Sequence, residues 1–300
     1  MFKDFNELHD SLLSGEIRTI VVAAAHDEHT LESVFNASQK LPIQYIFVGN
    51  RDKIMNISAK LGFEPDSDAI VDGIDNADCA QKAVQLIREG RGDVLMKGII
   101  ETGTLLKAVL NKQTGIRASG NLSHLSMLEV PSYHKLVAIT DAGIIPNPSF
   151  EQKADIIRNA VAFYKRLGFS KAKIAALCAV ESVSDKMPET SDAAELKALC
   201  DKGEFGDCIL EGPISFDLAV SSESAKIKGY QSPITGDVDI LMVPNITAGN
   251  VLCKSLLYWG GAKMAGCVLG AKVPVILVSR GATAREKFLS IMLCIKAGLN

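Results

Sequence analysis

The stretch DILMVPNITAGNVLCK, residues 239–254, contains the pattern from which the fold can be inferred. Its apolar run Ile240–Val243 shows no polar alternation, which is typical of a parallel strand buried on both faces. A short polar turn follows, and either Asn245 or Thr247 has the side chain needed to cap a helix. The stretch therefore predicts one strand–turn–helix unit of an α/β fold.

The same unit recurs along the chain, where short apolar runs alternate with longer amphipathic segments. This alternation predicts a doubly wound α/β architecture, with helices on both sheet faces and ligands at the carboxyl ends of the strands. The capping-box spacing of Ser149 and Gln152 marks the start of one helix. The expected strands are Thr19–Ala25, Tyr45–Gly49, Asp93–Met96, Leu136–Thr140, Lys173–Val180, Asp207–Leu210, Asp239–Val243 and Pro274–Val278. The expected helices are Asn76–Glu89, Phe150–Leu167, Asp192–Cys200 and Ala284–Ala297.

The amino-acid composition indicates a soluble globular protein. The 300 residues suit one large or two medium α/β domains, and 47% hydrophobic with 22% charged residues is typical of a soluble globular chain. A formal net charge of −3 gives no reason to expect a nucleic acid or an acidic membrane as partner. No window approaches about 18 uncharged apolar residues, and the N-terminus lacks a signal-peptide core. We therefore expect neither a membrane span nor secretion.

The seven cysteines are widely spaced and include no C-x-x-C pair. Their pattern indicates buried thiols in a reducing compartment, so we expect a cytoplasmic protein without disulfides or zinc. His26 and His29 could share one helix face, but no third ligand is near, which favours a solvated helix start over a metal site. The chain also lacks a Walker A loop, a G-x-G-x-x-G after the first strand, a G-x-S-x-G elbow and H-E-x-x-H.

Two further stretches combine a strand end with residues suited to an anion. In PVILVSRGATAREK, residues 274–287, the strand ends in Ser279 and Arg280 just before a helix N-terminus, whose free N–H groups favour an anion. The planar guanidinium of Arg280 matches phosphate oxygens. The spacing of Thr283 and Glu286 alone favours a structural capping box. In MKGIIETGTLLK, residues 96–107, lysine and threonine side chains give a weaker signal of the same kind.

These three stretches, in this order, resemble the phosphate acetyltransferase and phosphate butyryltransferase family, from about residue 93 to the C-terminus. Further landmarks are Ser123–Met127, Asp141 with Pro146–Pro148, and Phe216–Asp217. Acetyl-transferring relatives usually have an aspartate at the place of Glu286. They also tend to have a coenzyme A-contacting arginine where this chain has Tyr258-Trp259 ahead of Gly260-Gly261. Both departures are similar to the butyryl or branched-chain phosphotransacylase branch.

The resemblance implies two α/β/α domains with mostly parallel sheets and an interdomain active-site cleft, as in isocitrate and isopropylmalate dehydrogenases. Because residues 141–148 are rich in turn formers, we place the first domain at 1–140 plus 270–300 and the second at 141–269. The implied reaction interconverts butyryl- or branched acyl-CoA plus phosphate with acyl phosphate plus CoA. It implies CoA as a substrate, no metal and no permanently bound cofactor, and a homodimer or higher homo-oligomer.

The resemblance also implies roles for single residues, in a direct thiolate attack within a ternary complex. Arg280 would bind phosphate, Ser279 would donate to the developing oxyanion, and Glu286 would take the thiol proton. A thiol pKa of about 8.5 and a glutamate pKa of about 4.3 require a raised glutamate pKa or concerted transfer. The expected substrate-binding residues are Lys97, Thr102, Thr104, Lys107, Ser123, Asn245, Asn250 and Gly281.

Three alternatives stay open. The first is the same reaction with acetyl preferred, since two buried methylenes contribute only about 0.8 kcal/mol each. The second is a metal- and NAD-dependent hydroxyacid dehydrogenase, which shares the two-domain plan, although the chain has no aspartate cluster at ligand spacing. The third is a non-catalytic CoA-binding sensor, which would keep Arg280 but would not need Ser279 and Glu286.

Overall fold

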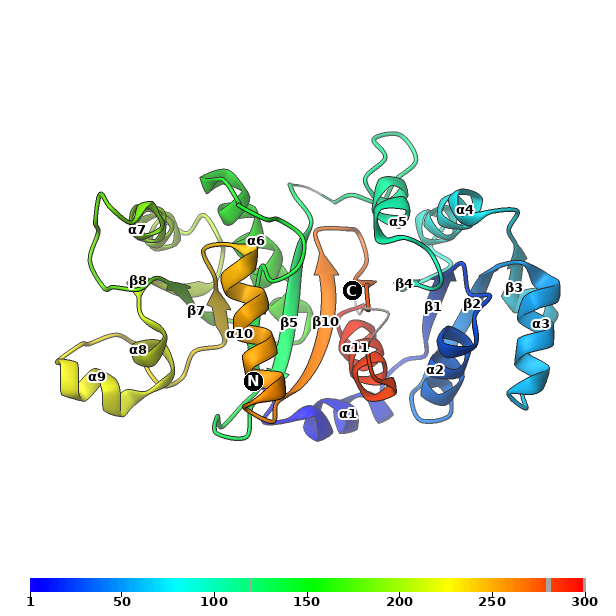
Figure 1. Ribbon diagram of the computed structural model, residues 1–300, viewed down its shortest axis with the longest axis horizontal. Helices are drawn as coiled ribbons and strands as arrows, with labels where there is room; N and C mark the ends of the chain where they lie inside the picture. Colours follow the sequence, from blue (N-terminus) through cyan, green and yellow to red (C-terminus); the bar gives the residue numbers. More distant parts are fainter. Residues whose placement is uncertain (119, 279–281, 299–300) are drawn as a thin grey trace. The chain divides into compact units, whose positions relative to one another are not determined.

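The computed structural model describes residues 1–118, 120–278 and 282–298 (Figure 1). The chain divides into two compact units. Unit 1 comprises Met1–Phe5 and Gly120–Met264, and unit 2 comprises Asn6–Ser119 and Ala265–Asn300. The sequence predicts that the first domain passes into the second near residue 140, whereas unit 2 passes into unit 1 at 119–120. The reason is that residues 123–140 form two strands that pair within unit 1.

Unit 2 contains strands in the spatial order β3-β2-β1-β4-β11-β10. Neighbours from β3 to β11 are parallel, and β10 is antiparallel to β11. The strands are β1 (Arg18–Ala23), β2 (Ile43–Gly49), β3 (Ile70–Asp72), β4 (Val94–Lys97), β10 (Lys263–Leu269) and β11 (Val275–Ile276). The helices are α1 (Phe5–Leu13), α2 (Glu28–Ser38), α3 (Arg51–Lys60), α4 (Asn76–Arg88), α5 (Thr102–Val109) and α11 (Ala284–Ala297), with a 3₁₀ turn at Ser67–Ala69.

Unit 1 contains strands in the order β5-β6-β9-β7-β8. The four strands from β6 to β8 are parallel, and β5 is antiparallel to β6. The strands are β5 (Ser123–Glu129), β6 (Val137–Thr140), β7 (Ala172–Leu177), β8 (Cys208–Ile214) and β9 (Ile240–Met242). The helices are α6 (Phe150–Arg166), α7 (Pro188–Asp201), α8 (Phe216–Val220), α9 (Ser222–Lys228) and α10 (Ile246–Tyr258).

The structure confirms the expected α/β class with mostly parallel pairing. Each predicted strand and helix is present, with ends shifted by a few residues, and the Ser149–Gln152 capping box forms at the start of α6. The parallel strands are apolar because they are covered on both faces: Val21, Ile240 and Leu241 are almost fully buried. All seven cysteines are free thiols. No helix in the described part of the chain is long and apolar enough to cross a membrane.

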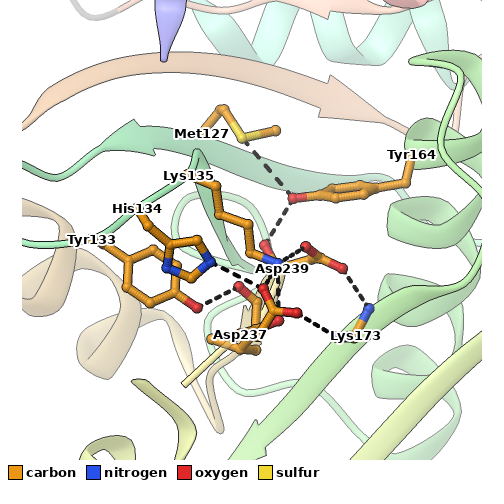
Figure 2. Close-up of polar contacts among 9 residues, drawn as sticks. Met127, Tyr133, His134, Lys135, Tyr164, Lys173, Asp237 and Asp239 are labelled. Carbon is orange, nitrogen blue, oxygen red and sulfur yellow. Dashed lines mark hydrogen bonds and ion pairs between the residues drawn. The ribbon is translucent and has the colours of Figure 1, made fainter. Parts of the chain in front are cut away.

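A buried ionic network ties together the strands of unit 1 at their amino ends (Figure 2). The Lys135 ammonium, just before β6, lies 2.6 Å from a carboxylate oxygen of Asp237 and 2.6 Å from one of Asp239. The backbone N–H of Lys173 in β7 donates to the other Asp239 oxygen at 2.8 Å, and the Tyr164 hydroxyl donates to the Asp239 carbonyl at 2.8 Å. Lys135 and Asp239 are only 8% and 9% exposed. The network therefore fixes how β6, β7 and β9 meet.

Candidate functional site

The first group of predicted residues lies at the carboxyl edge of unit 2, the edge at which its parallel strands end. β4 ends at Lys97, and β11 lies beside it in parallel, with Ile276 opposite Met96. Both strands therefore reach the edge where open α/β sheets bind ligands. Ser279, Arg280 and Gly281, predicted to follow β11, lie outside the described residues.

Gly98 holds the end of β4 close to the end of β1. Its N–H donates to the Ala23 carbonyl at 2.9 Å, and the Ile99 N–H donates to the Ala24 carbonyl at 2.9 Å. A Cβ atom at position 98 would lie 2.2 Å from the Ala24 carbonyl oxygen, so only glycine fits. This contact explains the glycine of the Met96-Lys97-Gly98 stretch and fixes where Lys97 leaves the sheet.

Four predicted substrate-binding residues follow one another at this edge. Lys97 is half-buried, and its ammonium donates to the Gly98 carbonyl at 3.1 Å. Thr102 and Thr104 lie in the first turn of α5, where the N-cap residue Glu101 makes no side-chain cap. Lys107 is exposed farther along the same helix. The structure thus brings these four side chains onto one strand end and one helix.

Glu286 closes a capping box at the start of α11. One oxygen, Oε2, accepts from the Thr283 N–H at 2.7 Å and from the Thr283 hydroxyl at 2.9 Å. The Thr283 hydroxyl oxygen in turn accepts from the Glu286 N–H at 3.2 Å. The structural role favoured by spacing is therefore confirmed, and the proposed proton transfer stays a prediction.

The second group lies at the carboxyl edge of unit 1, where β9 leads into α10. Asn245 is the N-cap, and its side-chain oxygen accepts from the Ala248 N–H at 3.0 Å. A Cβ at Gly249 would lie 3.0 Å from the Ala142 Cα atom, so this glycine lets α10 approach the loop after β6. Asn250 is exposed on α10. The structure therefore assigns Asn245 a capping contact and leaves the Asn250 side chain accessible.

Ser123 is placed differently from the other predicted residues. Its side chain is fully buried, and its hydroxyl oxygen accepts from the Asn159 side-chain amide at 3.0 Å. This contact joins β5 to α6. The described contact of Ser123 is thus structural, and its predicted substrate contact remains untested.

His124, which the sequence alone did not mark as a site residue, lies at the carboxyl edge of unit 1. Because β5 runs antiparallel to β6, its first residues lie beside the end of β6, and the Thr140 hydroxyl donates to the His124 carbonyl at 2.9 Å. Desolvation lowers the pKa of His124, and the charge of Asp141 acts in the opposite direction. The lowered pKa favours a neutral imidazole at neutral pH. The only signal in the sequence was its place in the Ser123–Met127 landmark.

Asp141 organises the loop after β6. Its buried carboxylate accepts from the N–H groups of Gly143, Ile144 and Ile145 at 2.8, 2.9 and 3.1 Å. These contacts explain why an aspartate stands at the start of the predicted turn-rich segment.

The described residues contain no group of three or more side chains that could hold a metal ion. The residue after His26, Asp27, is the N-cap of α2.

Comparison with known proteins identifies relatives over nearly the whole chain. The family described as "Phosphate acetyl/butaryl transferase" matches residues 73–295. The chain is 37% identical to phosphate butyryltransferase of Clostridium acetobutylicum over 293 residues, covering 98% of this chain and 97% of the relative. It is also 37% identical to phosphate acetyltransferase of Thermotoga maritima, covering 93% and 95%. The crystal structure of a branched-chain phosphotransacylase from Enterococcus faecalis V583 superposes with a TM-score of 0.82 at 34% identity, covering 94% and 99%.

Proposed function

Because this chain belongs to the phosphate acetyl/butyryl transferase family of acyltransferases, we propose that it moves butyryl or a branched short acyl group between CoA and inorganic phosphate. The observation that carries the proposal is the nearly full-length likeness to a phosphate butyryltransferase and a branched-chain phosphotransacylase. The carboxyl edge of unit 2, where β4 and β11 end side by side, supplies a suitable place for the chemistry.

The proposed mechanism needs no covalent enzyme intermediate. CoA and acyl phosphate are held together, and the thiolate attacks the acyl carbon while phosphate leaves. Arg280 binds the phosphate, Ser279 stabilises the oxyanion and Glu286 accepts the thiol proton; these roles rest on the family resemblance. The difference of about four pKa units between a free thiol and a free glutamate corresponds to roughly 6 kcal/mol, so either the protein raises the glutamate pKa or the proton moves while the sulfur attacks.

Acetyl is the second candidate acyl group, since the acetyltransferase of T. maritima is as similar to this chain as the butyryltransferase. The test is thiol release from acetyl-, butyryl- and isobutyryl-CoA with phosphate as the acceptor. We expect a kcat/KM roughly tenfold higher for the larger groups, because each buried methylene contributes about 0.8 kcal/mol. A higher value for acetyl-CoA would reverse the assignment, and no thiol release from any of them would remove the function.

We also propose a cytoplasmic homo-oligomer that uses CoA only as a substrate. Support comes from the family resemblance and from α10 with its C-cap Trp259: Val251, Tyr258 and Trp259 are 59%, 84% and 90% exposed. Val251 and Tyr258 are seven residues apart and so lie on one face of the helix, and apolar side chains gathered on one exposed face are typical of contact surfaces. Light scattering after size-exclusion chromatography tests the assembly, and a monomer at micromolar concentration would contradict it.

A further inference from the structure

Two of the free cysteines lie in contact at the amino edge of unit 1, where α7 ends and β8 begins. Cys200 is in the last turn of α7, Cys208 is the first residue of β8, and their Sγ atoms are 3.3 Å apart. The Cys200 thiol also lies 3.6 Å from the Cys208 carbonyl oxygen. Since a disulfide has an S–S bond of about 2.0 Å, small side-chain rotations bring the two sulfur atoms to bonding distance.

The loop between the two cysteines holds their sulfur atoms together. Gly203 and Gly206 have φ angles of 83° and 78°, a left-handed conformation that favours glycine and reverses the chain within a few residues. The Gly203 N–H donates to the Cys200 carbonyl at 2.8 Å, and the Cys208 N–H donates to the Gly206 carbonyl at 3.0 Å. Phe205, in the middle of the loop, is only 4% exposed. The contact between the sulfur atoms is therefore fixed by the turn.

This pair is more accessible than the neighbouring thiols Cys267 and Cys294 of unit 2. Those two side chains are fully buried, each with 0% exposure. Cys208 is half-buried, and Asp207, the residue before it, lines an open cavity of about 640 Å³. A small solute therefore has a route to the loop that carries Cys208, whereas the pair in unit 2 lies in the core.

We propose that Cys200 and Cys208 form a reversible oxidation site, which hydrogen peroxide converts into a disulfide. The Cys208 thiolate attacks one peroxide oxygen, the O–O bond breaks, and the hydroxide that leaves takes up the proton lost by the thiol. The Cys200 sulfur then attacks the sulfenic acid on Cys208, so that the S–S bond forms, the S–O bond breaks and the second thiol proton leaves in water. Peroxide gains the two electrons that the thiols lose, and a dithiol reductant reverses the change.

The surroundings of Cys208 set the conditions under which it reacts. Burial and the hydrogen bond with Cys200 raise the pKa of Cys208, so little thiolate is present near neutral pH. We therefore expect oxidation only when peroxide is in large excess. At low peroxide the pair stays reduced, as is usual for thiols in a reducing compartment.

Peptide mapping of the full chain tests the site. The protein is treated with millimolar hydrogen peroxide, its remaining thiols are blocked with N-ethylmaleimide in urea, and it is digested without reduction. Trypsin cleaves after Lys202, between the two cysteines, so a disulfide holds together two peptides that separate when dithiothreitol is added. We expect this linkage in most treated chains, with Cys267 and Cys294 still reduced. Both thiols of the α7–β8 pair still reduced, their oxidation without the linkage, or a linkage between two chains overturns the proposal.

Thermal unfolding distinguishes the disulfide from other oxidative changes. Because the bond closes the loop between α7 and β8, it restricts the unfolded chain. We expect peroxide to raise the unfolding temperature of wild type by at least about 3 °C more than that of Cys208→Ser, and dithiothreitol to abolish the difference. Cys178→Ser is the matched control, since this half-buried thiol donates to the Glu189 carbonyl at 3.5 Å, and it should respond like wild type. Equal shifts in wild type and Cys208→Ser overturn the proposal. Neither measurement uses turnover, so both outcomes are independent of the proposed function.

Discussion

At the scale of single residues, the Glu286 carboxylate has two roles: it caps α11, and in the proposed mechanism it accepts the thiol proton. Its contacts with Thr283 stabilise the first turn of α11, and both use the same oxygen, Oε2. No contact of the other oxygen is seen within the described part of the chain. A proton acceptor in this position would work from a fixed side chain, which limits how far it can reach.

The variant Glu286→Gln separates the capping role from the proton-accepting role, because glutamine also completes a capping box but cannot accept the thiol proton. We expect turnover to fall about 10²- to 10⁴-fold, as for loss of a general base, with almost no change in unfolding temperature. Steady-state assays and thermal melts measure both. Thr283→Ala is the complementary variant, which should lose about 1 kcal/mol of stability through the cap. Nearly normal turnover in Glu286→Gln would limit Glu286 to its capping role.

Gly98→Ala tests the close approach of β4 and β1. Its new methyl group would meet the Ala24 carbonyl, which is backbone and cannot rotate away. We expect a loss of about 1–3 kcal/mol in the free energy of unfolding, measured by urea denaturation. Gly103→Ala in α5 is the matched control, since nothing lies within 4 Å of its new Cβ, and it should be neutral or stabilising. Equal stability of the two variants would contradict the steric explanation.

At the scale of secondary-structure elements, the ionic network decides how three strands of unit 1 meet. Asp237 and Asp239 lie in the loop before β9, Lys135 precedes β6 and Lys173 belongs to β7 (Figure 2). Both ends of the stretch 239–245 therefore make structural contacts. Its aspartate joins the strands at their amino ends, and Asn245 begins α10 at the opposite edge.

Lys135→Met removes the cation but leaves Asp239 buried without its ammonium partner. We expect this variant to lose about 3–5 kcal/mol in the free energy of unfolding, as when one member of a buried pair is deleted. Lys82→Met is the control: its bridge to Asp78 is more exposed to solvent, so its removal should reduce stability far less. Chemical denaturation measures both. Similar losses in the two variants would show that the network does not bind the strands together.

Asp237 gives the network a dependence on pH. Burial opposes its ionisation, but hydrogen bonds from Lys135, Lys173 and His134 outweigh burial and lower its pKa. Since the folded-state pKa lies below the unfolded value of about 3.9, the carboxylate stabilises the fold above that pH, and this contribution is lost on further acidification. We expect the stability difference between wild type and Asp237→Asn to shrink below about pH 4, measured by urea midpoints. A constant difference would contradict this linkage.

At the scale of the whole molecule, local patterns could be predicted and long-range contacts could not. The Asn245 cap and the parallel strands other than the three-residue β3 depend on residues close in sequence, so their signals are present in short stretches. Strands β3, β5 and β10 were not predicted; in β5, Ser123, His124 and Ser126 interrupt the apolar run. The hydrogen bond that the Ser123 hydroxyl accepts comes from Asn159, 36 residues away, so no short stretch of sequence could indicate it.

The discontinuity of unit 2 affects synthesis on the ribosome. Residues 6–119 are made before β11, the parallel neighbour of β4, which belongs to the second segment of unit 2. Until that segment emerges, one side of β4 exposes unpaired N–H and C=O groups, the feature that lets a nascent strand pair with a foreign chain. Apart from Met1–Phe5, unit 1 lies wholly within residues 120–264 and can finish folding earlier. We therefore expect β4 to be the strand of a nascent chain most exposed to wrong pairing.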